Sequence, residues 1–272
     1  MRLRRKPNFD LLAHRTAMGV APENTLAGIR AAKRQGCKAV EFDVRLTADL
    51  VPVLMHDTTV DRTTDSEGDV AKLAFADLAT LDAAATFGES AFAGEPVPSL
   101  AEALVLCAEL GLQPHIEIKS DRRMAEATAH AVVQTLELYW DGSDQRPVIS
   151  SFEPRALDTV SRLAPVEFDR ALLLGAEPGD WRRRAVDLGV SAIHADADSL
   201  TEPLVDAIKE AGYELRAYTV NNAEQAKLLR TLGVDGVFCD APAELRKAMG
   251  PWPPRSAPTQ AEEIKADQPP SP

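Results

Sequence analysis

The chain has 272 residues, of which 45% are hydrophobic and 26% charged, and its formal net charge is −12 with a sequence pI of about 4.9. This composition is ordinary for a globular protein, and the length is sufficient to bury a full core. The negative charge argues against a nucleic-acid partner and against attraction to anionic membranes, because both reward basic surfaces. It is compatible with a small anionic substrate held at a locally positive site.

The two ends and the cysteines indicate a cytoplasmic protein. Residues 1–8 are basic but lead into no apolar run of the kind that a signal peptide needs, and no stretch approaches the ~20 apolar residues of a membrane span. Cys37, Cys107 and Cys239 are scattered, which suits a reducing compartment. We expect a flexible arm at 1–8 and a disordered, proline-rich tail at 251–272, with no membrane anchor.

The segment between the ends, residues 9–250, alternates short apolar runs with helical stretches. Eight runs have strand character: Phe9–Ala13, Ala39–Val44, Pro114–Ile118, Pro147–Ser151, Arg170–Leu174, Ser191–His194, Glu214–Val220 and Gly236–Cys239. Eight strands separated by helices favour parallel βα units closed into a (β/α)8 TIM barrel of the α/β class. A doubly wound open sheet is the structural alternative.

One segment interrupts this alternation. Residues 57–97 are too long for a βα loop, where about 2–6 residues are usual, and they contain many turn residues. We therefore predict a small insertion after the second strand. At the catalytic end of a barrel it could serve as a lid or a substrate wall, or it could be an excursion without function.

Carboxylates gather at the ends of neighbouring predicted strands. Glu41 and Asp43 point to the same side of the second strand because side chains alternate, and Glu117 ends the third. Strand ends of a (β/α)8 barrel converge on the rim that carries the active site. Three carboxylates there would repel one another, and one divalent cation resolves the conflict. Oxygen ligands suit Mg²⁺ or Ca²⁺ better than Zn²⁺. A salt-bridged structural rim is the alternative for the carboxylate pair.

Titratable and basic residues flank this cluster. His14 follows the first strand and His56 comes shortly after the second, so both could act in general acid–base catalysis, although a lone histidine at a strand end is more often structural. Arg15 and Lys119 supply the positive charge that an anionic substrate requires.

Weaker candidates follow at later strand ends. Phe152 and Tyr218 could wall a substrate or pack in the core. His194 closes the sixth strand and could line the mouth or cap that strand. The loop Asp240–Pro242 occupies a region that often binds phosphate in barrels, but it lacks glycine and carries a carboxylate, so it receives little weight.

At these residues the chain resembles the glycerophosphodiester phosphodiesterase family, in particular its bacterial cytoplasmic type. The matching pieces occur in order along nearly the whole chain: HR at 14–15, APENT at 21–25, EFDVRLT at 41–47, HD at 56–57, EIK at 117–119, SSF at 150–152, YTVN at 218–221 and GVDGVFCD at 233–240. Together they are highly specific, whereas each alone is weak.

The resemblance implies metal ligands at Glu41, Asp43 and Glu117, and an acid–base pair at His14 and His56. It implies that Arg15 and Lys119 stabilise phosphate charge, and that the insertion near 57–97 is typical of the family. It also implies attack by a glycerol hydroxyl on phosphorus, giving a cyclic phosphate that water opens.

The chain departs from the family pattern at two places, where Thr16 and Ala17 follow the HR pair in place of glycine and Cys239 stands where threonine is frequent. The implied activity is hydrolysis of small glycerophosphodiesters, such as glycerophosphocholine or glycerophosphoethanolamine, to sn-glycerol 3-phosphate and an alcohol. Two alternatives remain open at this point: a related barrel phosphodiesterase acting on lysophospholipids, and a non-catalytic barrel that binds a polyol phosphate.

Overall fold

Eight parallel strands form a closed barrel in the computed structural model, which describes residues 9–141, 145–164 and 168–251. β1 is hydrogen-bonded both to β2 and to β9, which closes the sheet. The barrel strands are β1 (Asp10–Ala13), β2 (Ala39–Leu46), β4 (Gln113–Ile118), β5 (Val148–Ser151), β6 (Asp169–Leu174), β7 (Ala192–Asp196), β8 (Glu214–Tyr218) and β9 (Gly236–Cys239). The predicted TIM barrel is therefore confirmed, and the open-sheet alternative is excluded.

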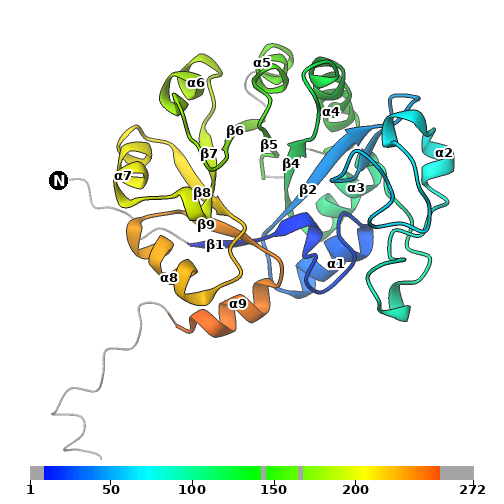
Figure 1. Cartoon of the computed structure of the whole chain (residues 1–272), viewed down its shortest axis with the longest axis horizontal. Coiled ribbons are helices and arrows are strands. Elements are labelled where there is room, and N and C mark those ends of the chain that lie inside the picture. Colours follow the sequence, from blue (N-terminus) through cyan, green and yellow to red (C-terminus); the bar gives the residue numbers. More distant parts are fainter. Residues whose placement is uncertain (1–8, 142–144, 165–167, 252–272) are drawn as a thin grey trace, which may run out of the picture.

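Helices cover the outside of the barrel (Figure 1). Two of these helices begin at residue types that favour the N-cap position. The side chain of Thr25 accepts a hydrogen bond from the backbone N–H of Gly28, and Ser99 forms a capping box with Glu102. The helices are α1 (Leu26–Arg34), α3 (Leu100–Leu110), α4 (Ala125–Tyr139), α5 (Pro154–Leu163), α6 (Trp181–Asp187), α7 (Glu202–Glu210), α8 (Ala223–Leu232) and α9 (Pro242–Met249).

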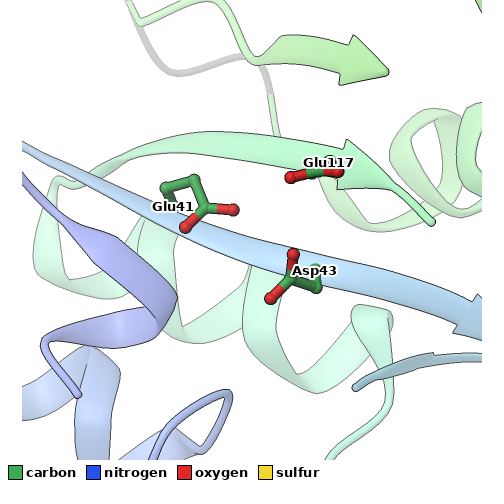
Figure 2. Close-up of side chains that lie close together, drawn as sticks. All are labelled: Glu41, Asp43 and Glu117. Atoms are coloured by element: carbon green, nitrogen blue, oxygen red, sulfur yellow. The ribbon is translucent and has the colours of Figure 1, made fainter. Parts of the chain in front are cut away.

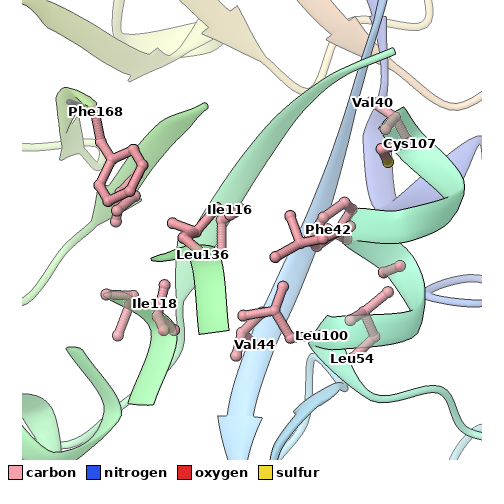
Figure 3. Packing of buried hydrophobic residues seen from close by; sticks show 14 of the residues in the cluster. Val40, Phe42, Val44, Leu54, Leu100, Cys107, Ile116, Ile118, Leu136 and Phe168 are labelled. Atoms are coloured by element: carbon pink, nitrogen blue, oxygen red, sulfur yellow. The ribbon is translucent and has the colours of Figure 1, made fainter. Parts of the chain in front are cut away.

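The core between strands and helices follows from alternation along the strands. Val40, Phe42 and Val44 of β2 face outward and pack with Leu100 of α3 and Ile116 of β4 in one buried cluster (Figure 3). The residues between them on β2 consequently face the barrel interior. This arrangement directs the acidic side chains of β2 inward while its apolar side chains secure the strand to the helical layer.

The insertion after β2 contains a short strand that the sequence did not suggest. β3 (Pro52–Leu54) pairs antiparallel with the end of β2, and the chain continues through α2 (Phe75–Leu78) and the 3₁₀ turns η2 (Val70–Lys72) and η3 (Ser90–Phe92). Its apolar side chains form a separate cluster, here called the insertion core: Val53, Met55, Val60, Val70, Leu78, Ala83 and Val97. The segment is thus packed around its own centre beside the barrel.

The insertion leaves and rejoins the barrel at adjacent points. The backbone N–H of Leu54 donates to the carbonyl of Pro98 at 3.0 Å, and Val53 forms an antiparallel bridge with Ser99. Its two ends therefore lie side by side, directly before α3.

A layer of rings fills the middle of the barrel. His115 and His194 stack with ring centroids 5.7 Å apart, and Phe238 meets His194 edge-on at 4.9 Å. The prediction that the sixth strand ends at His194 was wrong, because β7 continues to Asp196 and places His194 inside the barrel.

Among the described residues, every helix is too short or too polar to span a bilayer. The predicted arm at 1–8 and all of the predicted tail except Pro251 lie outside the described residues.

Candidate active site

Three carboxylates meet at the C-terminal end of the barrel (Figure 2). Glu41 and Asp43 come from β2, and Glu117 lies beside Asp43 on the neighbouring strand β4. One oxygen from each of the three lies within 4.8 Å of the others, and both β2 residues are buried. The parallel register of β2 and β4 therefore produces the cluster directly.

The pKa values of the three carboxylates shift in opposite directions. Burial, and then the neighbouring charge of Asp43, raise the pKa of Glu41 well above its ordinary value and that of Glu117 to about 7. Burial also works against the ionised form of Asp43, but the charges of Lys119, His56 and Arg15 outweigh it and lower the pKa of that carboxyl. Three close carboxylates, of which two are buried, fit a hard divalent cation, which would let all three ionise together.

Two basic side chains border the carboxylates. Lys119 Nζ lies 2.8 Å from Glu117 Oε1 and 3.5 Å from Asp43 Oδ1, and Arg15 Nε lies 3.6 Å from Asp43 Oδ2. The Arg15 Nε–H is buried and has no hydrogen-bond partner among the described residues, whereas its backbone N–H donates to Glu41 Oε2 at 2.8 Å. The guanidinium therefore keeps a donor available beside the acidic cluster.

Arg15 lies in a strained turn. η1 (His14–Thr16) follows β1, and Arg15, Thr16 and Ala17 all have positive φ values of 42°, 67° and 75°. Left-handed backbone favours glycine, so three consecutive non-glycine residues in this region store backbone strain. Gly28 of α1 packs so closely that a Cβ there would lie 2.1 Å from Thr16 Oγ1. The contact between turn and helix holds the strained conformation in place.

Each proposed catalytic histidine is paired with an aspartate. His14 Nδ1 lies 2.7 Å from Asp240 Oδ1, and His56 Nδ1 lies 2.6 Å from Asp57 Oδ1. A carboxylate that accepts from Nδ1–H leaves Nε2 as the nitrogen that can exchange protons with a substrate. Burial lowers the pKa of His56, and the charge of Asp43 and the bond to Asp57 offset this in part.

A second set of polar residues holds this arrangement. Asn24 Nδ2 donates to Asp43 Oδ2 at 2.9 Å, and Asn24 Oδ1 accepts from the Asp43 backbone N–H at 3.0 Å. Arg62 of the insertion donates to both oxygens of Glu23 at 2.8 Å and, through Nε, to Asp57 Oδ2 at 2.6 Å. The insertion thus fixes the aspartate that orients His56.

Sequence reasoning missed these supporting residues, which are Glu23, Asn24, Asp57, Arg62 and Asp240. The adjacent pair His56–Asp57 and the segment APENT at 21–25 were visible signals for three of the five. Asp240 was given little weight because it was weighed as a phosphate contact, whereas the structure pairs it with a histidine.

Two aromatic residues stand beside the cluster on other strands. The rings of Phe152 and Tyr218 meet edge-on at 6.1 Å, and Lys119 Nζ lies 6.0 Å from the Phe152 ring centroid. The Tyr218 hydroxyl donates to the carbonyl of Leu174, while Phe152 is 45% exposed. Phe152 therefore presents apolar surface to solvent next to the basic and acidic groups. The nine residues that were predicted to bind metal or substrate or to act in catalysis lie together at this mouth.

A small cavity lies beneath these groups. It has a volume of about 40 Å³, room for an ion or a water molecule, and His14, Glu41, Glu117, His194 and Phe238 are among the residues that line it. The cavity itself is therefore too small to enclose a whole phosphodiester.

Comparisons with known proteins agree with the geometry. The model of the "Glycerophosphoryl diester phosphodiesterase family" matches residues 14–244. A glycerophosphodiester phosphodiesterase of Caldanaerobacter subterraneus subsp. tengcongensis is 32% identical over 235 residues, which cover 86% of this chain and 95% of the relative.

Two solved structures are similar in fold and sequence. A phosphodiesterase of Oleispira antarctica, solved in complex with the product sn-glycerol-3-phosphate, superposes with a TM-score of 0.84 and 35% identity, over 88% of this chain and 96% of that one. A glycerophosphodiester phosphodiesterase of Agrobacterium tumefaciens str. C58 superposes with a TM-score of 0.72 and 27% identity, over 89% of this chain and all of that one.

Proposed function

Since this chain belongs to the glycerophosphoryl diester phosphodiesterase family and is a phosphodiesterase, we propose that it hydrolyses small glycerophosphodiesters, such as glycerophosphocholine or glycerophosphoethanolamine, to sn-glycerol 3-phosphate and an alcohol. The observation that carries the proposal is a cluster of three close carboxylates, two of them buried, flanked by two histidines that are each paired with an aspartate. The product bound to the Oleispira relative supports the same substrate class.

The acidic cluster is the proposed metal centre. Glu41, Asp43 and Glu117 would hold one divalent cation, Mg²⁺ or Ca²⁺, because their oxygens lie close together and a cation would offset the repulsion and burial that raise the pKa of Glu41 and Glu117. When bound, the cation supplies stabilisation of negative charge on the phosphoryl oxygens. Asn24 would keep Asp43 oriented for this role through its two hydrogen bonds.

Arg15 and Lys119 would bind the substrate's phosphate. The free Nε–H of Arg15 and the ammonium of Lys119 lie on either side of Asp43, so they can donate to phosphoryl oxygens above it. Phe152 and Tyr218 would wall the site on the side of β5 and β8. The substrate would thus be held by charge at its phosphate and by apolar surface beside it.

The two histidines would move the protons. His14 Nε2 would take the proton from the glycerol 2-hydroxyl as that oxygen attacks phosphorus, while His56 Nε2 would protonate the departing alcohol. A cyclic phosphate results. His56 would then take a proton from water, which opens the ring, and His14 would return its proton to the 2-oxygen. Asp240 and Asp57 would stabilise each imidazolium as it forms.

A direct assay tests the proposal. The protein is incubated with glycerophosphocholine and Mg²⁺ or Ca²⁺, and glycerol 3-phosphate and choline are measured. Both products should appear together, and Asp43→Asn should remove most of the activity. Release of choline phosphate in place of glycerol 3-phosphate would contradict the proposed bond cleavage. The proposed acid–base groups and ligand set are all present, so no observation favours a non-catalytic binding barrel.

A further inference from the structure

A second cavity opens at the opposite end of the barrel from the carboxylates. Its volume is about 410 Å³, and residues at the starts of β1, β2, β4 and within β8 line it. Volumes of this size are typical of small-molecule sites. The ring layer of His115, His194 and Phe238 lies between this cavity and the catalytic mouth. Neither the proposed reaction nor its metal centre uses this end of the barrel.

The cavity is lined by a buried arginine with unused donors. Arg216 is 6% exposed, and its Nη2 lies 2.6 Å from Oε1 of Glu214. Its Nε and Nη1 are buried and have no hydrogen-bond partner among the described residues. A buried, unsatisfied donor on a charged group costs free energy, so an acceptor that enters the cavity would be favoured.

The neighbours above Arg216 do not balance its charge. Burial, and then the charge of Arg216 itself, hold the pKa values of His115 and His194 well below their ordinary range, so both imidazoles are neutral. Neither offers a negative charge to the guanidinium. The Oε1 of Gln145, which also lines the cavity, is buried without a partner as well, so the cavity wall holds polar atoms of both kinds.

The rim of the cavity adds positive charge. Lys38 and Arg246 line it, and Arg246 is held in place because Nη1 donates to the carbonyl of Gln35 at 2.8 Å. Asp10 is the carboxylate in the lining, and none of the ion pairs among the described residues includes it or Lys38. The cavity is thus lined by three cations, Arg216, Lys38 and Arg246, and by one carboxylate, Asp10. The exposed Glu214 pairs with Arg216. The cavity therefore carries an excess of positive charge, although the net charge of the whole protein is −12.

We propose that this N-terminal cavity is a binding site for a small oxyanion, a phosphate or a carboxylate, that accepts hydrogen bonds from Arg216 and lies near Lys38. The size of the cavity suits a free anion or a small phosphate ester and is too small for a lipid or a nucleic acid. The inference stands independently of the proposed catalytic function, because it concerns the opposite end of the barrel.

Hydrogen–deuterium exchange of the full chain tests this site. Inorganic phosphate, glycerol 3-phosphate and acetate are titrated separately, and protection is followed in peptides that cover the starts of β1, β2 and β8. Saturable protection by the two phosphates assigns a phosphate site, and protection by acetate as well assigns a general oxyanion site. Peptides that contain η1 and His56 report binding at the catalytic mouth, so the two ends are read separately.

Variants connect the protection to the named residues. Arg216→Met should weaken binding by at least about tenfold, since hydrogen bonds to a charged group are lost. Lys38→Ala removes an exposed side chain without disturbing the core, so it keeps the test valid if Arg216→Met folds poorly, and it should weaken binding to a smaller extent. Lys33→Ala, an exposed lysine outside the cavity, should bind like the wild type. Absence of saturable protection at these strand starts, or equal affinity in all three variants, would overturn the proposal.

Discussion

His14 Nδ1 lies 2.7 Å from Oδ1 of Asp240, although 226 positions separate the two residues in the sequence. Closure of the barrel produces this contact, because β1 and β9 are hydrogen-bonded neighbours and each residue follows one of them. Asp240 is itself held by Asn221, whose Oδ1 accepts from the Asp240 backbone N–H at 2.8 Å. The orientation of His14 therefore depends on the last strand and on the loop after β8.

Asp240→Asn should reduce turnover without abolishing it. An asparagine can keep the hydrogen bond but cannot stabilise the imidazolium, so kcat should fall by less than in His14→Ala. The measurement is kcat with glycerophosphocholine, compared between Asp240→Asn, His14→Ala and the wild type. A variant whose kcat equals that of the wild type would show that the pair is purely structural.

His14→Ala and His56→Ala should each cut turnover by about 10²–10⁴-fold with little change in melting temperature, because both side chains lie at the open mouth. A leaving group of low pKa, such as p-nitrophenol, needs no protonation. It should therefore rescue His56→Ala more than His14→Ala. Equal rescue of both variants would refute the assigned roles while leaving the site intact.

Glu41→Gln should have opposite effects on the stability of the metal-free protein and on its stabilisation by added metal. The pKa of Glu41 is raised by burial and by its acidic neighbours, so a neutral isostere should stabilise the metal-free protein. Each kcal/mol corresponds to about 2–4 °C for a domain of this size. Added Mg²⁺ or Ca²⁺ should raise the melting temperature of the wild type more than that of the variant, since a ligand is lost. EDTA should abolish wild-type turnover. A variant that is less stable than the wild type without metal would contradict this account.

The buried histidines His115 and His194 should make the fold sensitive to acid. Their pKa values are lowered in the folded state, so below about pH 6.5 the unfolded chain binds protons that the folded chain does not. Stability should consequently fall as the pH drops, by up to about 1.4 kcal/mol per pH unit for each histidine. His194→Leu should flatten this slope in urea titrations at several pH values, whereas the exposed His130→Ala should not. An unchanged slope in His194→Leu would remove His194 from the explanation.

Local patterns predicted the barrel, and together with the family resemblance they pointed to the nine residues that lie at its mouth. Alternation along β2 and β4 placed Glu41, Asp43 and Glu117 on the inner face, and the order of parallel strands brought them together. Partners that depend on closure or on loop geometry were not predictable in this way. The contact of His14 with Asp240 requires the first and last strands to meet, and that of Arg62 with Glu23 requires the path of the insertion.

The three-residue strand β3 and the extension of β7 beyond His194 were missed for a related reason. Both are set by pairing with a neighbouring strand, which a single sequence does not display. The functional roles of the mouth residues, the ion and the extent of the two chain ends remain predictions.

The adjoining ends of the insertion have a consequence for how this enzyme could diversify. Because Leu54 and Pro98 are hydrogen-bonded to each other, the segment between them is a nearly closed loop, and lengthening such a loop costs little additional closure entropy. With the insertion core as its own support, the segment could be exchanged or enlarged while the barrel strands keep their register. The constraint on such exchange is local: a new segment must keep His56 and Asp57 at its start and must still supply a cation where Arg62 reaches Glu23 and Asp57. The length and sequence of the remainder of this segment could therefore change while Glu41, Asp43 and Glu117 stay fixed on the barrel strands.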